Sequence, residues 1–202
     1  MKLPKNILLF TVFFSTNLSA QSYKAKIEQH REEYKAEFLK SSNSPLKQKD
    51  LAGLRFYEPN EKYKVECTFA ATKGGKPFEV PTTSGDSQTY TRFGQLSFQI
   101  DGQTHKLTVY RSPSLMNNPL YRDYLFVPFK DQTNGKDTYG GGRYIDLRMR
   151  EVNGDKVILD FNKAYNPYCA FGDGYSCPIP PKENHLKIAI EAGEKNYSKT
   201  GL

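Results

Sequence analysis

The stretch Leu96-Ser97-Phe98-Gln99-Ile100-Asp101-Gly102-Gln103-Thr104-His105-Lys106-Leu107-Thr108-Val109 decides the fold class of this 202-residue chain. Apolar and polar residues alternate on both sides of Asp101-Gly102, which is typical of a β-hairpin closed by a two-residue turn. A turn of that length pairs Phe98 with His105, so His105 lies on the apolar face. A buried, hydrogen-bonded histidine and a catalytic base are the two interpretations of that position.

The same period of two marks further segments that we interpret as strands, namely residues 63–69, 125–129, 145–149, 157–161 and 186–190. Pro128 lies within one of them and indicates a sheet edge or a bulge. Ahead of the strands, residues 22–40 carry Tyr23, Ile27, Tyr34 and Phe38 at helical spacing. The pattern predicts a mainly β fold, an antiparallel β-barrel or sandwich with an N-terminal helix packed against it.

The first twenty residues have the order of parts of a signal peptide. Lys2 and Lys5 precede an apolar stretch at residues 7–14, and Leu18-Ser19-Ala20 gives a small-residue cleavage site. The apolar stretch is shorter than the roughly 20 residues that cross a bilayer, so we expect no transmembrane anchor after cleavage. We therefore expect a signal peptide (1–20), a helical segment (21–44) and a single β-rich domain (45–202). The protein is expected to be exported, either periplasmic or extracellular.

The charge pattern argues against nucleic-acid binding. The formal net charge is +7, and it falls to +5 without Lys2 and Lys5 (7 − 2 = 5). Charges of both signs alternate along the chain, whereas a nucleic-acid surface clusters lysine and arginine on one face. No cofactor is expected, and the sequence predicts no particular protein partner.

Three cysteines have separate expected roles. Cys169 and Cys177 lie eight residues apart in a loop rich in glycine, proline and tyrosine, and export allows them to form a disulfide. Cys67 shares strand parity with Val65 and Phe69, so we expect a buried thiol. A metal site is not expected, because the chain has no C-x-x-C pair and no suitably spaced histidines.

The turn between residues 145–149 and 157–161 allows two registers. A two-residue loop at 153–154 would divide the apolar side chains between both faces, whereas a three-residue loop at 152–154 places them all on one face. The second register puts Asp146 directly opposite Asp160 on the other face. Like charges that face each other are destabilising, so this pair needs a raised pKa, a cation or a bridging arginine.

Arg143 and Arg148 are the cations within reach of that carboxylate pair. Gly140-Gly141-Gly142 precedes Arg143 and offers bare backbone amides to an anion, although such a run is also typical of a flexible turn. The expected ligand-binding residues are Arg143, Tyr144, Asn162, Tyr165, Asn166 and Asn184. The candidate catalytic acids and bases are Asp146, Asp160 and Glu183. A solvated face with an arginine cross-link is the alternative.

Two segments carry a family resemblance. The first reads YLFVPF at 124–129 and TYGGGRYIDL at 138–147, and the second reads DFNKAYNP at 160–167, CAF at 169–171, CPIPPKEN at 177–184 and AGE at 192–194. With these segments the chain resembles, over about residues 45–195, the bacterial family called domain of unknown function 1684 (DUF1684). The resemblance implies no established activity.

Three functions remain open on these observations. The favoured one is a small-ligand-binding β domain with a polar site of Arg, Asp and Asn, whose expected partner is a small anionic ligand. The second is a hydrolase that uses the Asp146 and Asp160 carboxylates, with Arg143 stabilising charge. The third is a structural or interaction protein of the cell envelope. A pocket that converges on these three side chains would favour a binding or catalytic role over a structural one.

Overall fold

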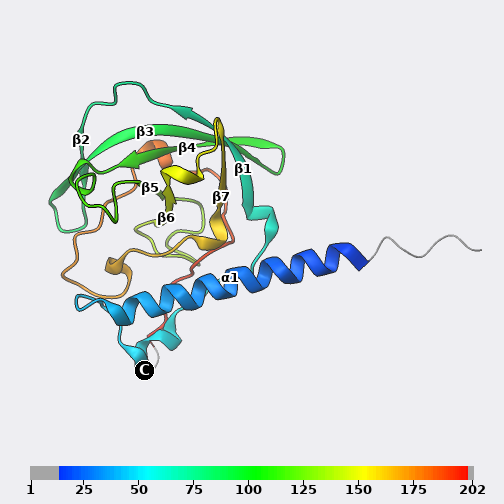
Figure 1. The fold of residues 1–202 in the computed structure, drawn as a ribbon. Helices are drawn as coiled ribbons and strands as arrows, with labels where there is room; N and C mark the ends of the chain where they lie inside the picture. The colour runs from blue at the N-terminus through cyan, green and yellow to red at the C-terminus, as the bar shows by residue number, and fades with distance from the viewer. Residues whose placement is uncertain (1–13, 200–202) are drawn as a thin grey trace, which may run out of the picture.

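A computed structural model describes the backbone of residues 14–199 and the side chains of residues 21–199. Residues 1–13 of the expected signal peptide lie outside the described range. The backbone of its remaining residues, 14–20, is helical. Figure 1 shows an antiparallel sheet curled into a half-barrel, with α1 (Phe14–Lys40) running across its open side. The predicted fold class is therefore confirmed.

The sheet has seven strands: β1 (Lys64–Ala71), β2 (Phe78–Pro81), β3 (Ser87–Ile100), β4 (Gln103–Arg111), β5 (Tyr124–Phe129), β6 (Arg143–Arg148) and β7 (Lys156–Asp160). Their order is β6-β5-β4-β3-β1-β7, and β2 pairs separately with β3. Strands β6 and β7 are therefore neighbours in the chain but lie at opposite ends of this path. Short 3-10 helices connect the elements at Gln48–Gly53, Glu61–Tyr63, Pro113–Leu115, Met149–Glu151, Phe161–Lys163, Tyr168–Ala170 and Lys182–Asn184.

The hairpin of β3 and β4 has the register that its turn predicts. Phe98 pairs with His105, and Asp101 and Gly102 have φ angles of 51° and 73°. Both angles lie in the left-handed region that a two-residue hairpin turn requires. The His105 ring packs 5.8 Å from the Phe98 ring, and its buried Nε2 finds no hydrogen-bond partner among the described residues.

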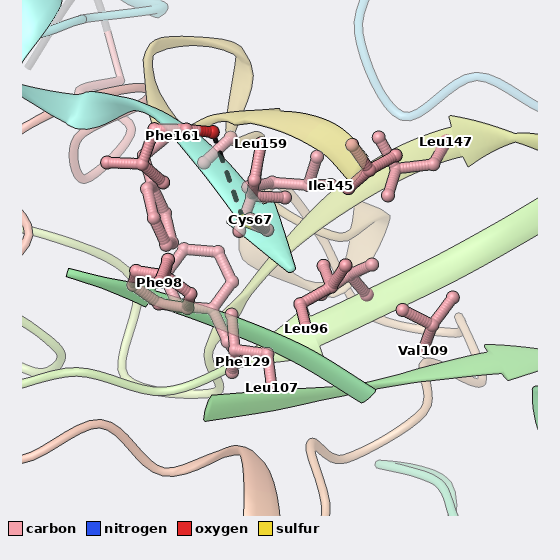
Figure 2. Close-up of a cluster of buried hydrophobic side chains, with 14 of the residues drawn as sticks. Cys67, Leu96, Phe98, Leu107, Val109, Phe129, Ile145, Leu147, Leu159 and Phe161 are labelled. Carbon is pink, nitrogen blue, oxygen red and sulfur yellow. Dashed lines mark hydrogen bonds between the residues drawn. The ribbon is translucent and has the colours of Figure 1, made fainter. Parts of the chain in front are cut away.

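The core fills the inside of the curled sheet. Figure 2 shows Cys67, Leu96, Leu107, Ile145 and Leu159 pointing into it from five different strands, and all five are buried. Burial raises the pKa of the Cys67 thiol to about 12, so this thiol remains protonated at neutral pH. The expected buried thiol is present, and the core packs both outer strands, β6 and β7, against the hairpin.

Helix α1 packs on the domain with the residues that its spacing predicts. Tyr23, Ile27 and Phe38 are buried and Tyr34 is partly buried, but the helix begins at Phe14 rather than near residue 22. The Arg31 guanidinium also holds the helix, because its Nη2 donates to the Tyr57 carbonyl at 2.6 Å. Within residues 14–199, no helix combines the length and the apolar character that crossing a membrane requires.

Asn184 explains how a proline, Pro128, is accommodated in a strand inside the sheet. Strand β5 lies inside the sheet rather than at its edge, but its pairing with β4 is limited to Tyr110 and Phe126. Beyond that pair, Asn184 Nδ2 donates to the carbonyls of Thr108 and Pro128 at 2.9 and 2.7 Å. Asn184 Oδ1 accepts from Thr108 N at 2.7 Å. The side chain thus replaces ladder bonds where proline has no N–H to donate.

Two further predictions concern the C-terminal part of the chain. The strand expected at 186–190 is wrong: this segment forms single backbone bonds, such as Leu186 N to Lys130 O at 2.7 Å, but no ladder. The expected disulfide between Cys169 and Cys177 is formed, with Cα atoms 6.3 Å apart. The segment after the disulfide is therefore held by single backbone bonds and by side chains such as Asn184, and it does not form a strand of the sheet.

Candidate functional site

A cleft of about 490 Å³ lies between the middle of α1 and the two outer strands of the sheet. Strand β6 lines it with Asp146, and strand β7 with Ile158 and Asp160. Its other walls are mainly polar and charged, and they comprise Tyr23, Lys26, Ile27, Gln29, His30, Glu33, Lys64, Ile145, Leu147, Glu151 and Lys163. Because separate parts of the chain converge on it, this cleft is our candidate functional site.

Strands β6 and β7 border the cleft without pairing to each other. The prediction that Asp146 faces Asp160 across neighbouring strands is therefore wrong, since β6 pairs with β5 and β7 pairs with β1. The chain leaves β6 through the 3-10 turn Met149–Glu151, in which Glu151 Oε2 accepts from Arg148 N at 2.6 Å. This turn removes Met149 from the strand that the expected hairpin needed. Both carboxylates nevertheless line the same cleft.

Asp146 presents an accessible carboxylate that two tyrosine hydroxyl groups contact. Tyr124 and Tyr165 donate to its Oδ1 at 2.8 and 2.7 Å, and no described residue donates to Oδ2. The carboxyl is exposed to the cleft, but the surrounding protein excludes water from most directions. That burial raises the pKa of Asp146, although the two phenols and the Arg148 charge oppose the shift. Asp146 can therefore accept a hydrogen bond or a proton from a molecule in the cleft.

Asp160 is buried and its oxygens are already occupied. Tyr23 Oη donates to both oxygens at 2.9 and 3.0 Å, and Asn162 N and Nδ2 each donate to Oδ1 at 3.0 Å. The bond from Asn162 N makes Asp160 the N-cap of the 3-10 helix Phe161–Lys163. This carboxylate therefore attaches α1 to the end of β7, which is a structural role.

Three lysines from separate elements surround the cleft. Lys26 comes from α1, Lys64 from β1 and Lys163 from the 3-10 helix after β7, and among the described residues none of them forms an ion pair. Lys64 Nζ lies 5.3 Å from the centre of the Tyr23 ring. The lysines offer positive charge to a ligand, but four carboxylates line the same cleft.

His30 is a cleft residue that the sequence patterns did not identify. It is half-buried, and burial followed by the Lys163 charge lowers its pKa, so the imidazole is neutral at pH 7. Its spacing of three residues from Ile27 and seven from Tyr23 places it on the buried side of α1. This helical spacing is the signal that could have predicted its position.

Arg143 does not reach the cleft. Its side chain is fully buried, and Nη2 donates to Asp131 at 2.8 Å and to the Ile190 carbonyl at 2.9 Å. Its Nη1 donates to the carbonyl of Ala192. The guanidinium thus fixes the C-terminal segment against the sheet, and the expected role in holding an anion has no support from its position. The Gly140–Gly142 run packs as a turn, in which Gly142 has a φ of 102°.

The other expected ligand-binding residues also bind the chain itself. Asn162 exchanges hydrogen bonds with the backbone of Asn60 at 2.8 and 2.9 Å, and Asn166 Nδ2 donates to the Lys195 carbonyl at 2.8 Å. Tyr144 donates to the Pro178 carbonyl at 2.5 Å. Together with Asn184, these residues tie down irregular segments, as asparagine side chains commonly do. Of the expected ligand-binding residues, Tyr165 and Asn162 contact carboxylates that line the cleft, Asp146 and Asp160 respectively.

Glu183 lies away from the cleft. Its Oε1 accepts from Tyr110 Oη at 2.9 Å and from Arg92 Nη2 at 2.7 Å. Burial alone would raise the pKa of Glu183, but the hydrogen bonds from Arg92 and Tyr110 lower it below the ordinary value. A lowered pKa keeps the group ionised at neutral pH, which suits an ion pair rather than a general acid.

Glu194 is a second strongly perturbed carboxyl, and the sequence patterns did not identify it. It is fully buried, and its Oε2 accepts from Asn166 N at 2.7 Å and from Tyr34 Oη of α1 at 2.9 Å. Burial raises the pKa of Glu194 to about 8, although these hydrogen bonds and the Arg143 charge oppose the shift. Because it is closed off from solvent, this carboxyl braces α1 rather than forming part of an accessible site.

Comparison with known proteins places the chain among proteins without an assigned activity. The model of a family described as "Protein of unknown function (DUF1684)" matches residues 49–195. A solution NMR structure of an uncharacterized protein of Haloarcula marismortui is 32% identical, with a TM-score of 0.67 over 89% of this chain and 97% of that chain. No curated protein matches the chain.

Proposed function

The chain belongs to the family of unknown function DUF1684, and because no activity comes with that membership, we propose from its own cleft that it binds a small polar ligand there. Asp146 Oδ2 accepts a hydrogen bond from an amino or hydroxyl group of this ligand. The lysines around the cleft hold an anionic group of the same ligand. The ligand therefore carries both kinds of group, as an amino acid or a short peptide does.

The chemistry of the cleft carries this proposal. Its volume of about 490 Å³ falls within the range of about 300–1,000 Å³ that is usual for small-molecule sites. Three lysines without ion-pair partners among the described residues face four carboxylates, and His30 is neutral. A purely anionic ligand, as expected from Arg143, fits this mixture less well, because the lysines and carboxylates sum to a charge of −1 (3 − 4 = −1).

The test is calorimetric titration of the protein with representative small molecules: inorganic phosphate, glutamate, lysine and a dipeptide. We expect the zwitterionic compounds to bind and Asp146→Asn to weaken them by about tenfold, because an amide accepts more weakly than a charged carboxylate. Glu191→Gln is the matched control, since Glu191 is exposed and does not line the cleft. If Asp146→Asn binds these compounds as tightly as the parent protein does, Asp146 does not contact the ligand.

Hydrolysis is the second candidate, because Asp146 combines access with a raised pKa. A mechanism with two carboxylates is not favoured, since Asp160 is occupied by Tyr23 and Asn162. Asp146 alone acts as the general base in this scheme, and its replacement by asparagine should lower turnover by about 100-fold or more. The assay is release of nitrophenol from a series of nitrophenyl esters and phosphates, with Glu191→Gln again as control.

We also propose that the protein works outside the cytoplasm. The Cys169–Cys177 disulfide supports this, because such bridges persist in oxidising compartments. Cleavage after Ala20 would retain every α1 residue that lines the cleft, the first of which is Tyr23. Cell fractionation followed by N-terminal sequencing should give an exported chain that begins at Gln21, and a cytoplasmic chain with Met1 would contradict the proposal.

A further inference from the structure

Exposed apolar side chains are concentrated in two loops that hydrogen bonds connect. Seven large hydrophobic side chains are exposed among the described residues, and four of them belong to two neighbouring loops. Leu120 is 74% exposed, Met116 43% and Tyr121 42%, all in the connection between β4 and β5. Met149, 37% exposed, follows β6. We call these four residues the apolar tip.

Hydrogen bonds join the two loops and hold their backbone. Met149 N donates to the Asp123 carbonyl at 2.8 Å. Arg148 Nη1 donates to the Leu120 carbonyl at 2.9 Å and to Asp123 Oδ1 at 2.8 Å. Arg148 thus fixes the backbone at Leu120, while the Leu120 side chain remains exposed to solvent. The apolar tip is therefore a fixed feature of this surface.

Arginine surrounds the apolar tip. The chain has eight arginines among its 29 basic residues, and four of them lie in these two loops or at their ends: Arg111, Arg122, Arg148 and Arg150. The loops, residues 111–123 and 148–151, contain no lysine. Two carboxylates oppose the arginines: Asp123, which pairs with Arg148 and Arg150, and Glu151, which accepts from Arg148 N. The surface therefore has an excess of positive charge around an apolar centre.

We propose that the apolar tip and its arginines attach the protein to a lipid surface that bears anionic headgroups. Leu120, Met116 and Met149 enter the boundary of the acyl layer, and Tyr121 lies at headgroup level, where an apolar ring with a polar end is favoured. Arg122 and Arg150, the exposed arginines of this surface, bind headgroup phosphates through paired hydrogen bonds. An acyl layer accepts protruding side chains without a matching pocket, whereas a protein partner requires complementary shape. This surface adjoins the cleft at Glu151, but none of the four apolar-tip residues lines the cleft, and the proposal does not depend on the proposed ligand.

Sedimentation with vesicles tests the proposal. We expect the protein to bind vesicles of equal parts phosphatidylglycerol and phosphatidylethanolamine more tightly than vesicles of phosphatidylcholine. The double substitution Leu120→Ser with Tyr121→Ser should weaken this binding by about tenfold or more, because buried apolar area is lost. Arg122→Gln with Arg150→Gln should have an effect of similar size, since each arginine near an anionic surface contributes about fivefold.

Matched substitutions elsewhere isolate the contribution of the surface. Leu39→Ser removes an exposed leucine of α1, and Lys76→Gln removes an exposed cation of a distant loop, so both should leave binding unchanged. Thermal melting of each variant confirms that it is folded. Equal binding by the Leu120 and Tyr121 variant and the parent protein would overturn the proposal. So would an oligomer in sedimentation velocity that this variant abolishes, because the apolar tip would then be a contact between copies of the chain.

Discussion

Replacing Glu194 by glutamine should stabilise the protein increasingly as the pH rises. Glu194 Oε1 and Asn166 Oδ1 are both buried acceptors without a hydrogen-bond partner among the described residues, and Asn166 N already binds Glu194 Oε2 at 2.7 Å. A proton on Glu194 removes a buried charge whose Oε1 has no donor, so burial favours the neutral acid. Glutamine is also neutral and keeps an oxygen that accepts from Tyr34.

The magnitude follows from the pKa of Glu194. Burial raises it from 4.5 to about 8, so the folded state binds a proton that the unfolded state has released within this interval. Stability that is complete below the unfolded pKa is therefore lost as the pH rises through the folded pKa. Between about pH 5 and pH 8, the free energy of unfolding of the parent protein should fall by about 3 kcal/mol through this group. The glutamine variant should lack this component.

The assay is urea unfolding of both proteins across that pH range, with the difference in free energy of unfolding as the readout. Glu191→Gln is the control, since Glu191 is exposed three residues earlier in the same segment and should not alter the pH dependence. Two results would refute the reasoning. Parallel pH profiles for Glu194→Gln and the parent would show that Glu194 does not titrate in this range. A variant destabilised equally at every pH would show that the network requires the carboxylate, with the Arg143 charge as its counterpart.

Further predictions concern residues that hold the chain together, and all are measured by chemical unfolding. Asn184→Ala should lower the free energy of unfolding by about 2–4 kcal/mol, because it leaves buried backbone groups of two strands unpaired; a loss within the measurement error would mean that water replaces the side chain. Arg143→Met should lower it by about 3–5 kcal/mol, since Asp131 is left buried and charged. Adding Asp131→Asn to that variant should recover part of the loss, and a further decrease would contradict the ion-pair explanation. Replacing Cys169 and Cys177 by serine should lower the free energy of unfolding by about 2–3 kcal/mol, the value for so short a loop. Reduction of the parent protein should give the same change, and a different value would contradict the assignment to the disulfide.

Local patterns predicted the parts of the fold that depend on neighbours in the sequence. The register of Phe98 on His105 follows from a two-residue turn, and residues near that turn have no freedom to choose other partners. The Cys169–Cys177 bridge closes a short loop for the same reason. The buried side of α1 follows from helical spacing, which needs no knowledge of what covers it.

The candidate site was predicted only in part. Asp146 and Tyr165 were both expected at the site and do form a hydrogen bond, but the partner expected for Asp146 was a carboxylate on a paired strand. Strand β7 instead pairs with β1, about 90 residues earlier in the chain, and α1 supplies the wall that the sequence patterns had not associated with these strands. Alternation along a strand shows which side chains share a face, but it does not show which strand lies beside them.

The sequence by itself determined the mainly β class, the helix, the central hairpin and the disulfide, because turn geometry and side-chain period act over a few residues. Tertiary structure alone decided that β6 and β7 remain apart, that Arg143 turns inward to Asp131 and that Glu194 lies beneath α1. Each of these outcomes depends on how the curled sheet closes over its core. A buried charged group is stable only when other groups pair with it. In this protein those groups belong to distant segments, which local sequence patterns do not identify.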